Sequence, residues 1–310
     1  MAAFAYSLLV LTYNRNHLLA MLARELEHFS QDGAEVIVVD NFSDQPATDV
    51  TGEFPWIINL RAPSNLGAAG RNLGFQAATG DIVICLDDDI AELSADAMER
   101  LDALFSDPRV AAVNFKVVDQ ETRQIVNWVH HREVEHFGDK TFDTYEITEG
   151  AVALRRAALK TSGGYPESFF LSHEGPDLAF RLMNDGFRVT YSPLVSVVHS
   201  FATEGRTSWR NYYFDTRNTL WLATRNLPWT YGTRVVLRQT ISMLIYAIRD
   251  GYGRWWLKGL IDGVRGIRRE LKDRKCLTRE AFARVRAIDK YRPSLIYVIR
   301  KRLPRRDLKF

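Results

Sequence analysis

The 310-residue sequence contains only two cysteines, Cys85 and Cys276. They lie far apart, and Cys85 stands inside an apolar run, so the sequence excludes a disulfide framework and a zinc site built on cysteines. So few thiols are typical of a reducing compartment, and we predict a cytoplasmic protein. The first residues, MAAFAYSLLVLTYNR, lack a basic segment and a cleavage pattern, so they predict a β-strand rather than a signal peptide.

The sequence also lacks an apolar run of the roughly 18 residues that cross a bilayer. The best candidate, VVLRQTISMLIYAI (235–248), is too short and contains Arg238. No internal repeat and no low-complexity linker interrupts the chain. These absences indicate a folded protein that does not span a membrane.

Negative charge is scarce in the last third of the chain. Residues 205–310 contain 26 Lys and Arg against 8 Asp and Glu, whereas residues 1–204 contain 15 and 30. The segment RWWLKGLIDGVRGIRREL (254–271) places basic residues beside Trp and Leu, a pattern that suits an anionic lipid surface. We expect this region to lie on the inner face of the cell membrane, although the same pattern would suit a helix packed on the acidic part or on a partner. No nucleic-acid-binding motif is present, so we expect no nucleic-acid partner.

Strand and helix patterns alternate up to about residue 120. Apolar, β-branched runs predict strands over 6–14, 34–41, 56–63 and 81–86, with helices over 17–29, 67–80 and 94–107. Such a βαβ series predicts a parallel α/β sheet.

The pattern changes beyond residue 110. Extended segments over 110–119 and 123–137 follow one another without a helix, so we expect the sheet to become mixed. A helix over 175–186, a strand over 187–200 and helices beyond 207 complete the prediction. We expect two regions, an α/β region over 1–204 and a basic helical extension over 205–310.

Three consecutive aspartates, Asp87, Asp88 and Asp89, follow the apolar run of the fourth predicted strand. Ligands of α/β sheets bind at such strand ends. Adjacent carboxylates repel one another unless a cation lies between them. They are therefore either a solvated loop that caps the next helix or a site for Mg²⁺ or Mn²⁺, which prefer oxygen ligands. Alternation along an extended backbone would place Asp87 and Asp89 on one side.

Two further segments fit a nucleotide. Asp40 closes the second predicted strand, where an acidic residue can accept hydrogen bonds from a ribose or base. SNLGAAGRNLG (64–74) supplies Asn65 and Arg71 near the start of a helix, an arrangement that favours phosphate. The alternative is a glycine-rich turn with a salt-bridged arginine, because the segment is neither G-x-G-x-x-G nor a P-loop.

Together, TYNR (12–15), VVDN (38–41), NLGAAGRNLG (65–74) and CLDDDI (85–90) resemble the family 2 glycosyltransferases of GT-A fold, including rhamnosyltransferase-like enzymes of bacterial cell-surface polysaccharides. The resemblance extends over about residues 7–200. It implies a GT-A mixed sheet with flanking helices, and a nucleoside diphosphate bound through Mg²⁺ or Mn²⁺ by a DxD motif, Asp87 and Asp89. The nucleotide-binding residues that it implies are Thr12, Asp40, Asn65, Arg71, Asp87 and Asp88.

A second part of the resemblance is FFLSHEGPDLAFRLMNDGFRVTYSP (169–193), where relatives carry acidic residues before a D-L-x-x-R helix. It implies Glu174 as the general base for an acceptor hydroxyl, with Asp177 as its helix-side partner and Arg181 pairing one of them. Many relatives have Glu-Asp where this chain has Glu174–Gly175, so the usual second acid is absent. Alternatively, Glu174 only caps the helix.

Two other positions follow from the resemblance. His199 matches a histidine that some relatives use as an additional metal ligand, although a lone histidine after a strand is commonly structural. Glu149 and Gly150 belong to a segment that lines the acceptor side in the family, with a plain turn as the alternative.

The predicted function is an inverting, metal-dependent glycosyl transfer from a nucleoside-diphosphate sugar to a hydroxyl of a glycan or a lipid-linked acceptor. One alternative is a sugar-1-phosphate nucleotidyltransferase, which would require a basic glycine-rich loop after the first strand, where this chain has TYNRNHLL. The other is a catalytically inactive binding module, which the missing acid at Gly175 favours.

Overall fold

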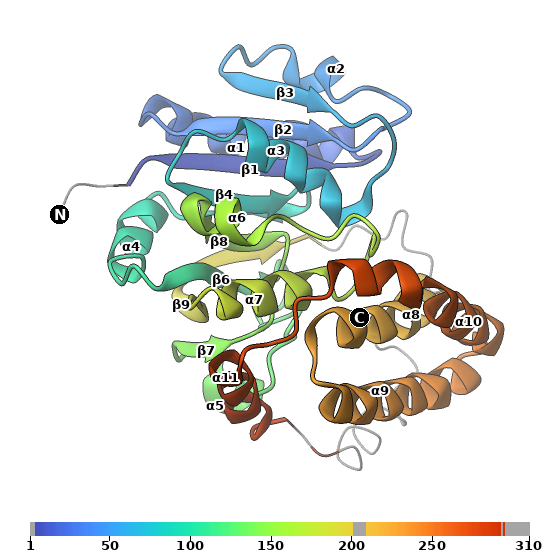
Figure 1. Ribbon diagram of the computed structural model, residues 1–310. Coiled ribbons are helices and arrows are strands. Elements are labelled where there is room, and N and C mark those ends of the chain that lie inside the picture. Colours follow the sequence, from blue (N-terminus) through green and yellow to red (C-terminus); the bar gives the residue numbers. More distant parts are fainter. Residues whose placement is uncertain (1–3, 201–208, 293, 295–310) are drawn as a thin grey trace.

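A computed structural model describes residues 4–200, 209–292 and 294 (Figure 1). In these residues nine strands form one mixed sheet in the order β3-β2-β1-β4-β8-β6-β9-β5, with β7 also paired to β9. The strands are β1 Tyr6–Thr12, β2 Glu35–Asp40, β3 Ile57–Arg61, β4 Ile82–Asp87, β5 Ile90–Ala91, β6 Val110–Asp119, β7 Phe142–Thr144, β8 Ala151–Arg155 and β9 Arg188–His199.

Helices cover both faces of the sheet and form most of the C-terminal third. They are α1 Asn16–Gln31, α2 Thr48–Thr51, η1 Gly67–Gly70, α3 Arg71–Ala77, α4 Ala97–Leu104, α5 Val134–Phe137, α6 Arg156–Ser162, α7 Glu174–Asn184, α8 Trp209–Asn226, α9 Trp229–Arg249, α10 Gly253–Glu270, η2 Leu271–Asp273 and α11 Arg279–Asp289.

The first four strands form the parallel half of the sheet, as predicted. β1 lies between β2 and β4, and β3 extends the sheet beyond β2. Apolar side chains alternate between two cores: Leu8 and Val10 pack with α1 and α4, whereas Leu9 packs with residues of α6, α7 and α8. Burial on both faces explains why these strands read as continuous apolar runs.

The second half is mixed, as predicted: β8 is antiparallel to both β4 and β6, and β6 is parallel to β9. The strand expected over 123–137 is wrong. Apart from a single bridge between Val118 and Ile125, this segment is irregular and ends in α5. β7 pairs with β9, while the ring of Trp128 packs against Tyr191 with centroids 5.1 Å apart. Aromatic packing of side chains therefore replaces strand pairing here.

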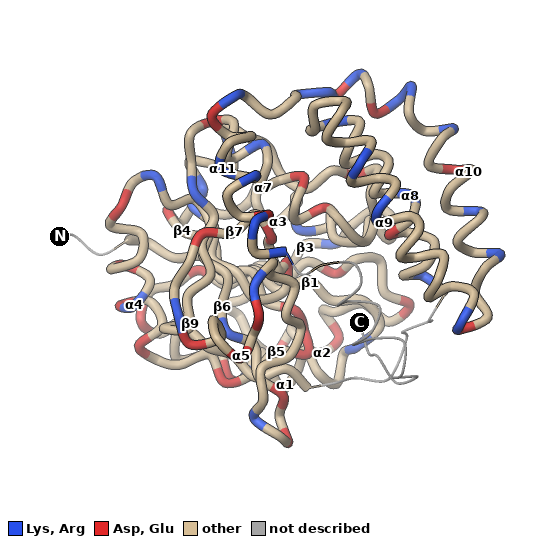
Figure 2. The backbone as a smooth tube through the Cα atoms, turned by 90° about the horizontal axis from the view of Figure 1, so that it is seen from below, with Lys and Arg blue, Asp and Glu red and all other residues tan. Residues whose placement is uncertain are grey.

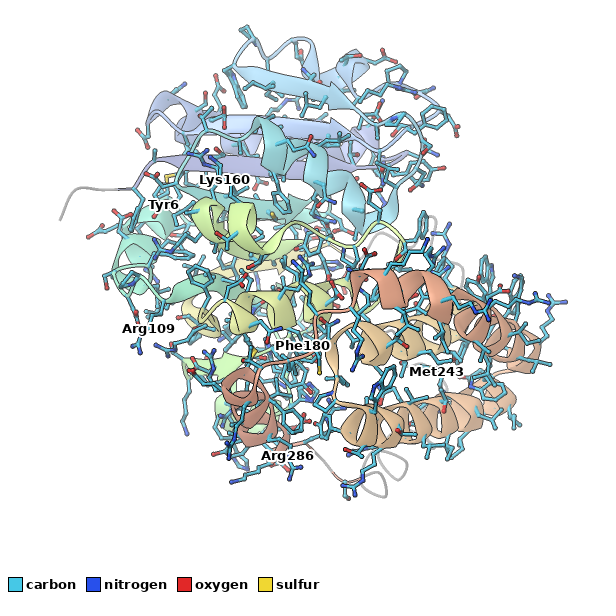
Figure 3. The ribbon with its side chains drawn as sticks, in the orientation of Figure 1. Tyr6, Arg109, Lys160, Phe180, Met243 and Arg286 are labelled. Atoms are coloured by element: carbon cyan, nitrogen blue, oxygen red, sulfur yellow. The ribbon has the colours of Figure 1, made fainter. Side chains whose placement is uncertain are left out.

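The helices that follow β9 are integrated with the sheet. Leu220 and Trp221 of α8 and Val285 of α11 belong to the same core cluster as β8 and α7. Met243 of α9, which is labelled in Figure 3, belongs to a smaller core cluster that includes Tyr212 of α8. The boundary predicted between residues 204 and 205 lies outside the described residues, so the division into two regions stays a prediction.

Many Lys and Arg residues lie along α10, in agreement with the basic C-terminal composition (Figure 2). None of the helices in the described ranges combines the length and the apolarity of a membrane-spanning segment.

A buried ion-pair network joins α7 to α8. The Asp177 side chain is fully buried and accepts hydrogen bonds from Arg181 Nε at 3.0 Å, Arg225 Nε at 2.9 Å and Asn226 Nδ2 at 2.7 Å. Two of these donors come from α8, nearly 50 residues away in sequence. The network therefore ties the C-terminal helices to the sheet.

Replacing Asp177 tests this role. Asp177→Ala leaves the buried Arg181 guanidinium without its carboxylate, while Arg225 keeps Glu270 and Asp273, so we expect it to lower the free energy of unfolding by about 3 kcal/mol in urea denaturation. The exposed Glu99 on α4 provides the control, because Glu99→Ala should change this free energy by less than about 0.5 kcal/mol. Equal effects of the two substitutions would contradict the assignment.

Candidate active site

The carboxyl ends of β1, β2 and β4 meet at one cavity of about 410 Å³. Ligands of α/β sheets bind at this edge because the loops that follow parallel strands meet there. Three predicted site residues, Thr12, Asp87 and Asp88, line this cavity. The full lining consists of Leu11, Thr12, Tyr13, Asn14, Arg15, Asn41, Asp87, Asp88 and Arg210.

Arg15 holds two of the three consecutive aspartates. Its Nη1 lies 3.0 Å from Asp88 Oδ1 and 3.0 Å from Asp89 Oδ2. Asp88 also accepts a 2.8 Å hydrogen bond from the Thr12 hydroxyl. Burial raises the pKa of Asp88 to about 6, against the attraction of Arg15, which lowers it. Arg15, from the loop after β1, therefore compensates a buried acidic pair that follows β4.

Asp87 belongs to a different ion pair. Its carboxylate accepts from Arg71, which is buried in the first turn of α3, while 42% of the Asp87 side chain remains exposed. The attraction of Asp87 raises the pKa of Arg71 despite the burial of the guanidinium. Arg71 and Asp87, both predicted for the nucleotide, are thus brought together.

The alternation expected along the three aspartates is not followed. β4 ends at Asp87, and Asp88 and Asp89 form a turn, so extended geometry no longer applies to them. Asp88 shares Arg15 with Asp89, whereas Asp87 faces Arg71. Asp89 is buried, and its Oδ1 lies 3.5 Å from His199 Nε2, because β5 pairs Ile90 with His199.

The site suits a divalent cation bound by one protein carboxylate, Asp87, rather than one enclosed by several protein ligands. No group of three or more His, Cys, Asp or Glu in the described part of the chain is arranged to hold a metal ion. Mg²⁺, however, commonly takes one or two carboxylates from protein and its other ligands from water and phosphate. The partly exposed Asp87 carboxylate on the cavity suits such a cation, whereas the predicted ligands Asp89 and His199 are buried and do not line the cavity.

The other predicted nucleotide residues have defined partners. Asp40 is buried and accepts from Ser43 N at 2.7 Å, Ala47 N at 3.1 Å and Arg61 Nη1 at 2.7 Å. Asn65 is hydrogen-bonded to Asn41 rather than to Asp40.

Asn41, for which we predicted no separate role, organises the loop that contains Asn65. Its Nδ2 donates to Asn65 Oδ1 and to Gly67 O, both at 3.1 Å, and its Oδ1 accepts from Leu66 N at 2.9 Å. One amide side chain at the end of β2 thus shapes the loop that leads into α3.

Glu174 begins α7 and is buried. Burial, followed by the nearby charge of Glu149, raises its pKa well above the usual range. The loop before it is held by α8, because Asn218 Nδ2 donates to the carbonyls of Phe169, Leu171 and Ser172 at 3.0, 2.7 and 2.7 Å. The C-terminal helices therefore position the predicted base.

Sequence reasoning missed the roles of Arg15, Arg210, Asn218 and Arg225. Arg15 stands within the TYNR segment, so its place after a strand end was an available signal. The other three lie on α8, and no local pattern links them to residues of the sheet.

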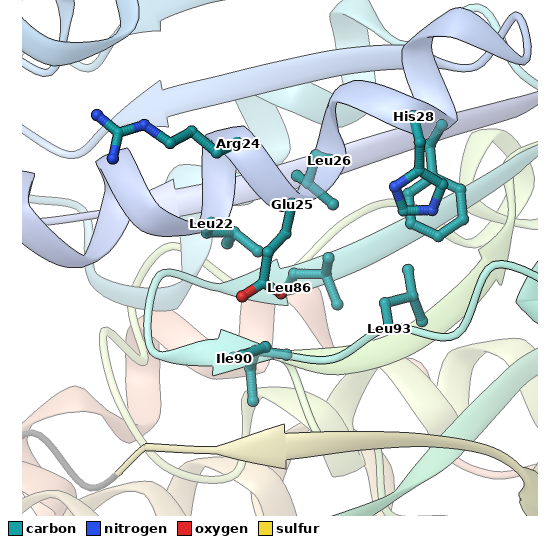
Figure 4. A pocket seen from close by; sticks show the side chains of 10 residues that line it. Leu22, Arg24, Glu25, Leu26, His28, Leu86, Ile90 and Leu93 are labelled. Atoms are coloured by element: carbon teal, nitrogen blue, oxygen red, sulfur yellow. The ribbon is translucent and has the colours of Figure 1, made fainter.

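A second cavity, of about 290 Å³, lies between α1 and β5 (Figure 4). Its lining includes Leu22, Leu26 and Leu93 together with Glu25 and His28. It shares none of its lining residues with the cavity at the ends of β1, β2 and β4.

Residues 7–163 match the family described as glycosyl transferase family 2. This match spans half of the chain, and the chain belongs to that family. The resemblance inferred from the four motifs is thereby confirmed.

Two curated relatives are similar over much of this chain. The "Pre-mycofactocin glycosyltransferase" of Mycobacterium tuberculosis is 29% identical over 79% of this chain and 53% of its own length. The "O-antigen chain rhamnosyltransferase WbaN" of Salmonella anatum is 26% identical over 68% of this chain and 71% of its own. The chain thus spans about half the length of the first of these relatives.

Among solved structures, the mannosyltransferase PcManGT of Pyrobaculum calidifontis, in complex with GDP-Man and Mn²⁺, has a TM-score of 0.52 at 18% identity, covering 98% of this chain and 81% of that one. The predicted GT-A fold, a mixed sheet with flanking helices followed by further helices, is confirmed.

The pKa of Asp88 reports on the Arg15 pair. Arg15→Met removes the cation that lowers this pKa, so we expect it to rise from about 6 by roughly one unit or more. Carboxyl-carbon NMR titration of the two proteins measures the shift. Arg100→Met, which breaks an exposed pair with Asp96, is the control and should leave Asp88 unchanged. An unchanged pKa of Asp88 in Arg15→Met would refute the pairing.

Proposed function

We propose that this chain is an inverting, metal-dependent glycosyltransferase that moves a sugar from a nucleoside-diphosphate sugar to an acceptor hydroxyl. The observation that carries the proposal is the meeting of Thr12, Asn41 and Asp87 at one cavity, in a member of family 2. The O-antigen relative supports an acceptor in cell-surface or lipid-linked glycan synthesis.

On the donor side, Asp87 would hold Mg²⁺ or Mn²⁺, with water and the diphosphate as its other ligands. Asp89 and His199, predicted as further ligands, would have to move to join it, because the described residues form no metal-binding group of three such side chains. The bound cation would neutralise the charge that develops on the leaving diphosphate. The nucleotide would be contacted by the other predicted residues or by the loops that they shape; these residues are Thr12, Asp40, Asn65 and Asp88. Arg71 keeps the Asp87 carboxylate in place at the cavity.

On the acceptor side, Glu174 would act as the general base. Inversion needs one displacement at the anomeric carbon, with a carboxylate that removes the proton of the attacking hydroxyl. The Asp177 carboxylate has no exposed surface and already accepts hydrogen bonds from three other side chains. We therefore assign it a positioning role between α7 and α8, as the helix-side partner of Glu174.

Donor turnover tests this function. With Mn²⁺, a panel of UDP-, GDP- and dTDP-sugars should include one from which the chain releases nucleoside diphosphate. Asp87→Asn should lower this rate by about 100-fold or more, because it removes charge from the proposed metal ligand. The exposed Asp49 on α2 supplies the control substitution, Asp49→Asn. Pyrophosphate exchange would instead support a sugar-1-phosphate nucleotidyltransferase, and binding without turnover an inactive module.

We further propose that α10 contacts an anionic membrane surface. Leu257, Ile261 and Val264 are 51, 41 and 56% exposed and follow one another at helical spacing, so they form one apolar stripe. Exposed Arg254 and Lys258 accompany this stripe. Apolar side chains between basic ones complement acyl chains below anionic headgroups.

Vesicle binding tests this surface. Leu257→Glu combined with Ile261→Glu should weaken sedimentation with phosphatidylserine-containing vesicles at least about tenfold, a loss of 1.4 kcal/mol. Met21→Glu on α1 is a matched control, since Met21 is also an exposed apolar residue, at 60%. Equal vesicle binding by the double variant and the unaltered chain would exclude α10 as the contact.

A further inference from the structure

Residue 175, in the first turn of α7, has no room for a side chain. A Cβ placed on Gly175 would overlap the Ile147 carbonyl oxygen and would lie 2.7 Å from Glu149 Oε1. The Glu149 carboxylate therefore lies directly against the α-carbon of Gly175, next in sequence to the proposed base. An acid at this point of the site comes from another segment of the chain.

The segment that carries Glu149 also adjoins the donor aspartate. Leu86 of β4 pairs with Ala151 of β8, and Asp87 N donates to Gly150 O at 3.1 Å. A Cβ on Gly150 would overlap the Asp87 carboxylate. Sheet register thus places Glu149 between the end of β4 and the start of α7.

The charge of Glu149 acts on the neighbouring Glu174. Burial raises the pKa of Glu149 to about 7. Burial and the charge of Glu149 raise the pKa of Glu174, and the positive charge of Arg71 opposes both shifts. Glu174 Oε2 is buried and has no hydrogen-bond partner among the described residues. A buried carboxylate oxygen without a donor is costly, which is typical of a group kept available for a ligand.

Resting on the proposed function, we propose that Glu149 and Glu174 form the carboxylate pair that receives the proton of the acceptor hydroxyl. As the acceptor oxygen forms its bond to the anomeric carbon, the bond from that carbon to the diphosphate oxygen breaks. The leaving nucleoside diphosphate takes that electron pair, and the hydroxyl proton passes to the pair. Glu149 thereby supplies the second acid that Gly175 cannot.

Single-turnover kinetics with the active donor and acceptor test the pair. Glu149→Gln and Glu174→Gln should each lower the rate constant about 100-fold or more, the usual contribution of a general base. Because the two act as one unit, the double variant should be slower than either single one by no more than about twofold. Donor affinity should change little, since neither residue lines the donor cavity.

Chemical rescue separates catalysis from structure. Glu149→Ala opens space for formate, and added formate should raise the rate constant of this variant at least about tenfold. If Glu149 had only a structural role, formate would not change the rate constant. Glu167→Gln is the matched control: this glutamate is exposed in the segment before α7, and its loss should leave the rate within about twofold. Thermal unfolding of each variant identifies any that fail to fold. If a glutamine variant fails to fold, formate rescue of Glu149→Ala decides whether Glu149 takes part in proton transfer.

Two results would overturn the pair: a Glu149→Gln rate close to that of the unaltered chain, or single effects that multiply in the double variant. Absence of turnover by the unaltered chain with every donor would instead refute the proposed function itself. The two failures are therefore distinguishable.

Discussion

Three adjacent carboxylates at the end of a buried strand must be compensated by cations, and the site is organised by this constraint. Arg15 reaches Asp88 and Asp89 from the start of α1, and Arg71 reaches Asp87 from α3. Leaving one of these charges buried and unpaired would cost several kcal/mol. The loops after β1 and β3 are therefore positioned by the same charges that the site uses.

The helices that follow β9 are part of this organisation. Asn218 fixes the backbone before Glu174, and Arg225 pairs with the buried Asp177 at 2.9 Å. A helix that supplies both contacts cannot be removed without disturbing the acceptor side, because each broken contact leaves a buried polar group without its partner. At the same time, α10 keeps an outer apolar and basic face. One helical region thus serves the geometry of the site on its inner side and offers a surface on its outer side.

Close backbone approach connects the donor and acceptor halves. Gly150 meets the Asp87 carboxylate, and Gly175 meets that of Glu149, so each glycine admits an acid from another segment. The departure at Gly175 from the Glu-Asp pattern of relatives thereby has a steric reason. Side chains of β4, of the turn before β8 and of α7 converge in a way that no single motif contains.

Local signals determined much of this protein from its sequence. Continuous apolar runs predicted β1 to β4, the D-L-x-x-R segment predicted α7, and four short motifs predicted the family, because these features depend on residues close together in the chain. The strand expected over 123–137 and the alternation of Asp87 and Asp89 failed, since side-chain packing and a turn prevailed over extended backbone. Only the tertiary structure decided which cation meets which carboxylate: Asp87 with Arg71, Asp89 with Arg15, and Asp177 with Arg225 depend on contacts between segments tens of residues apart, where charge and burial are set by the whole fold.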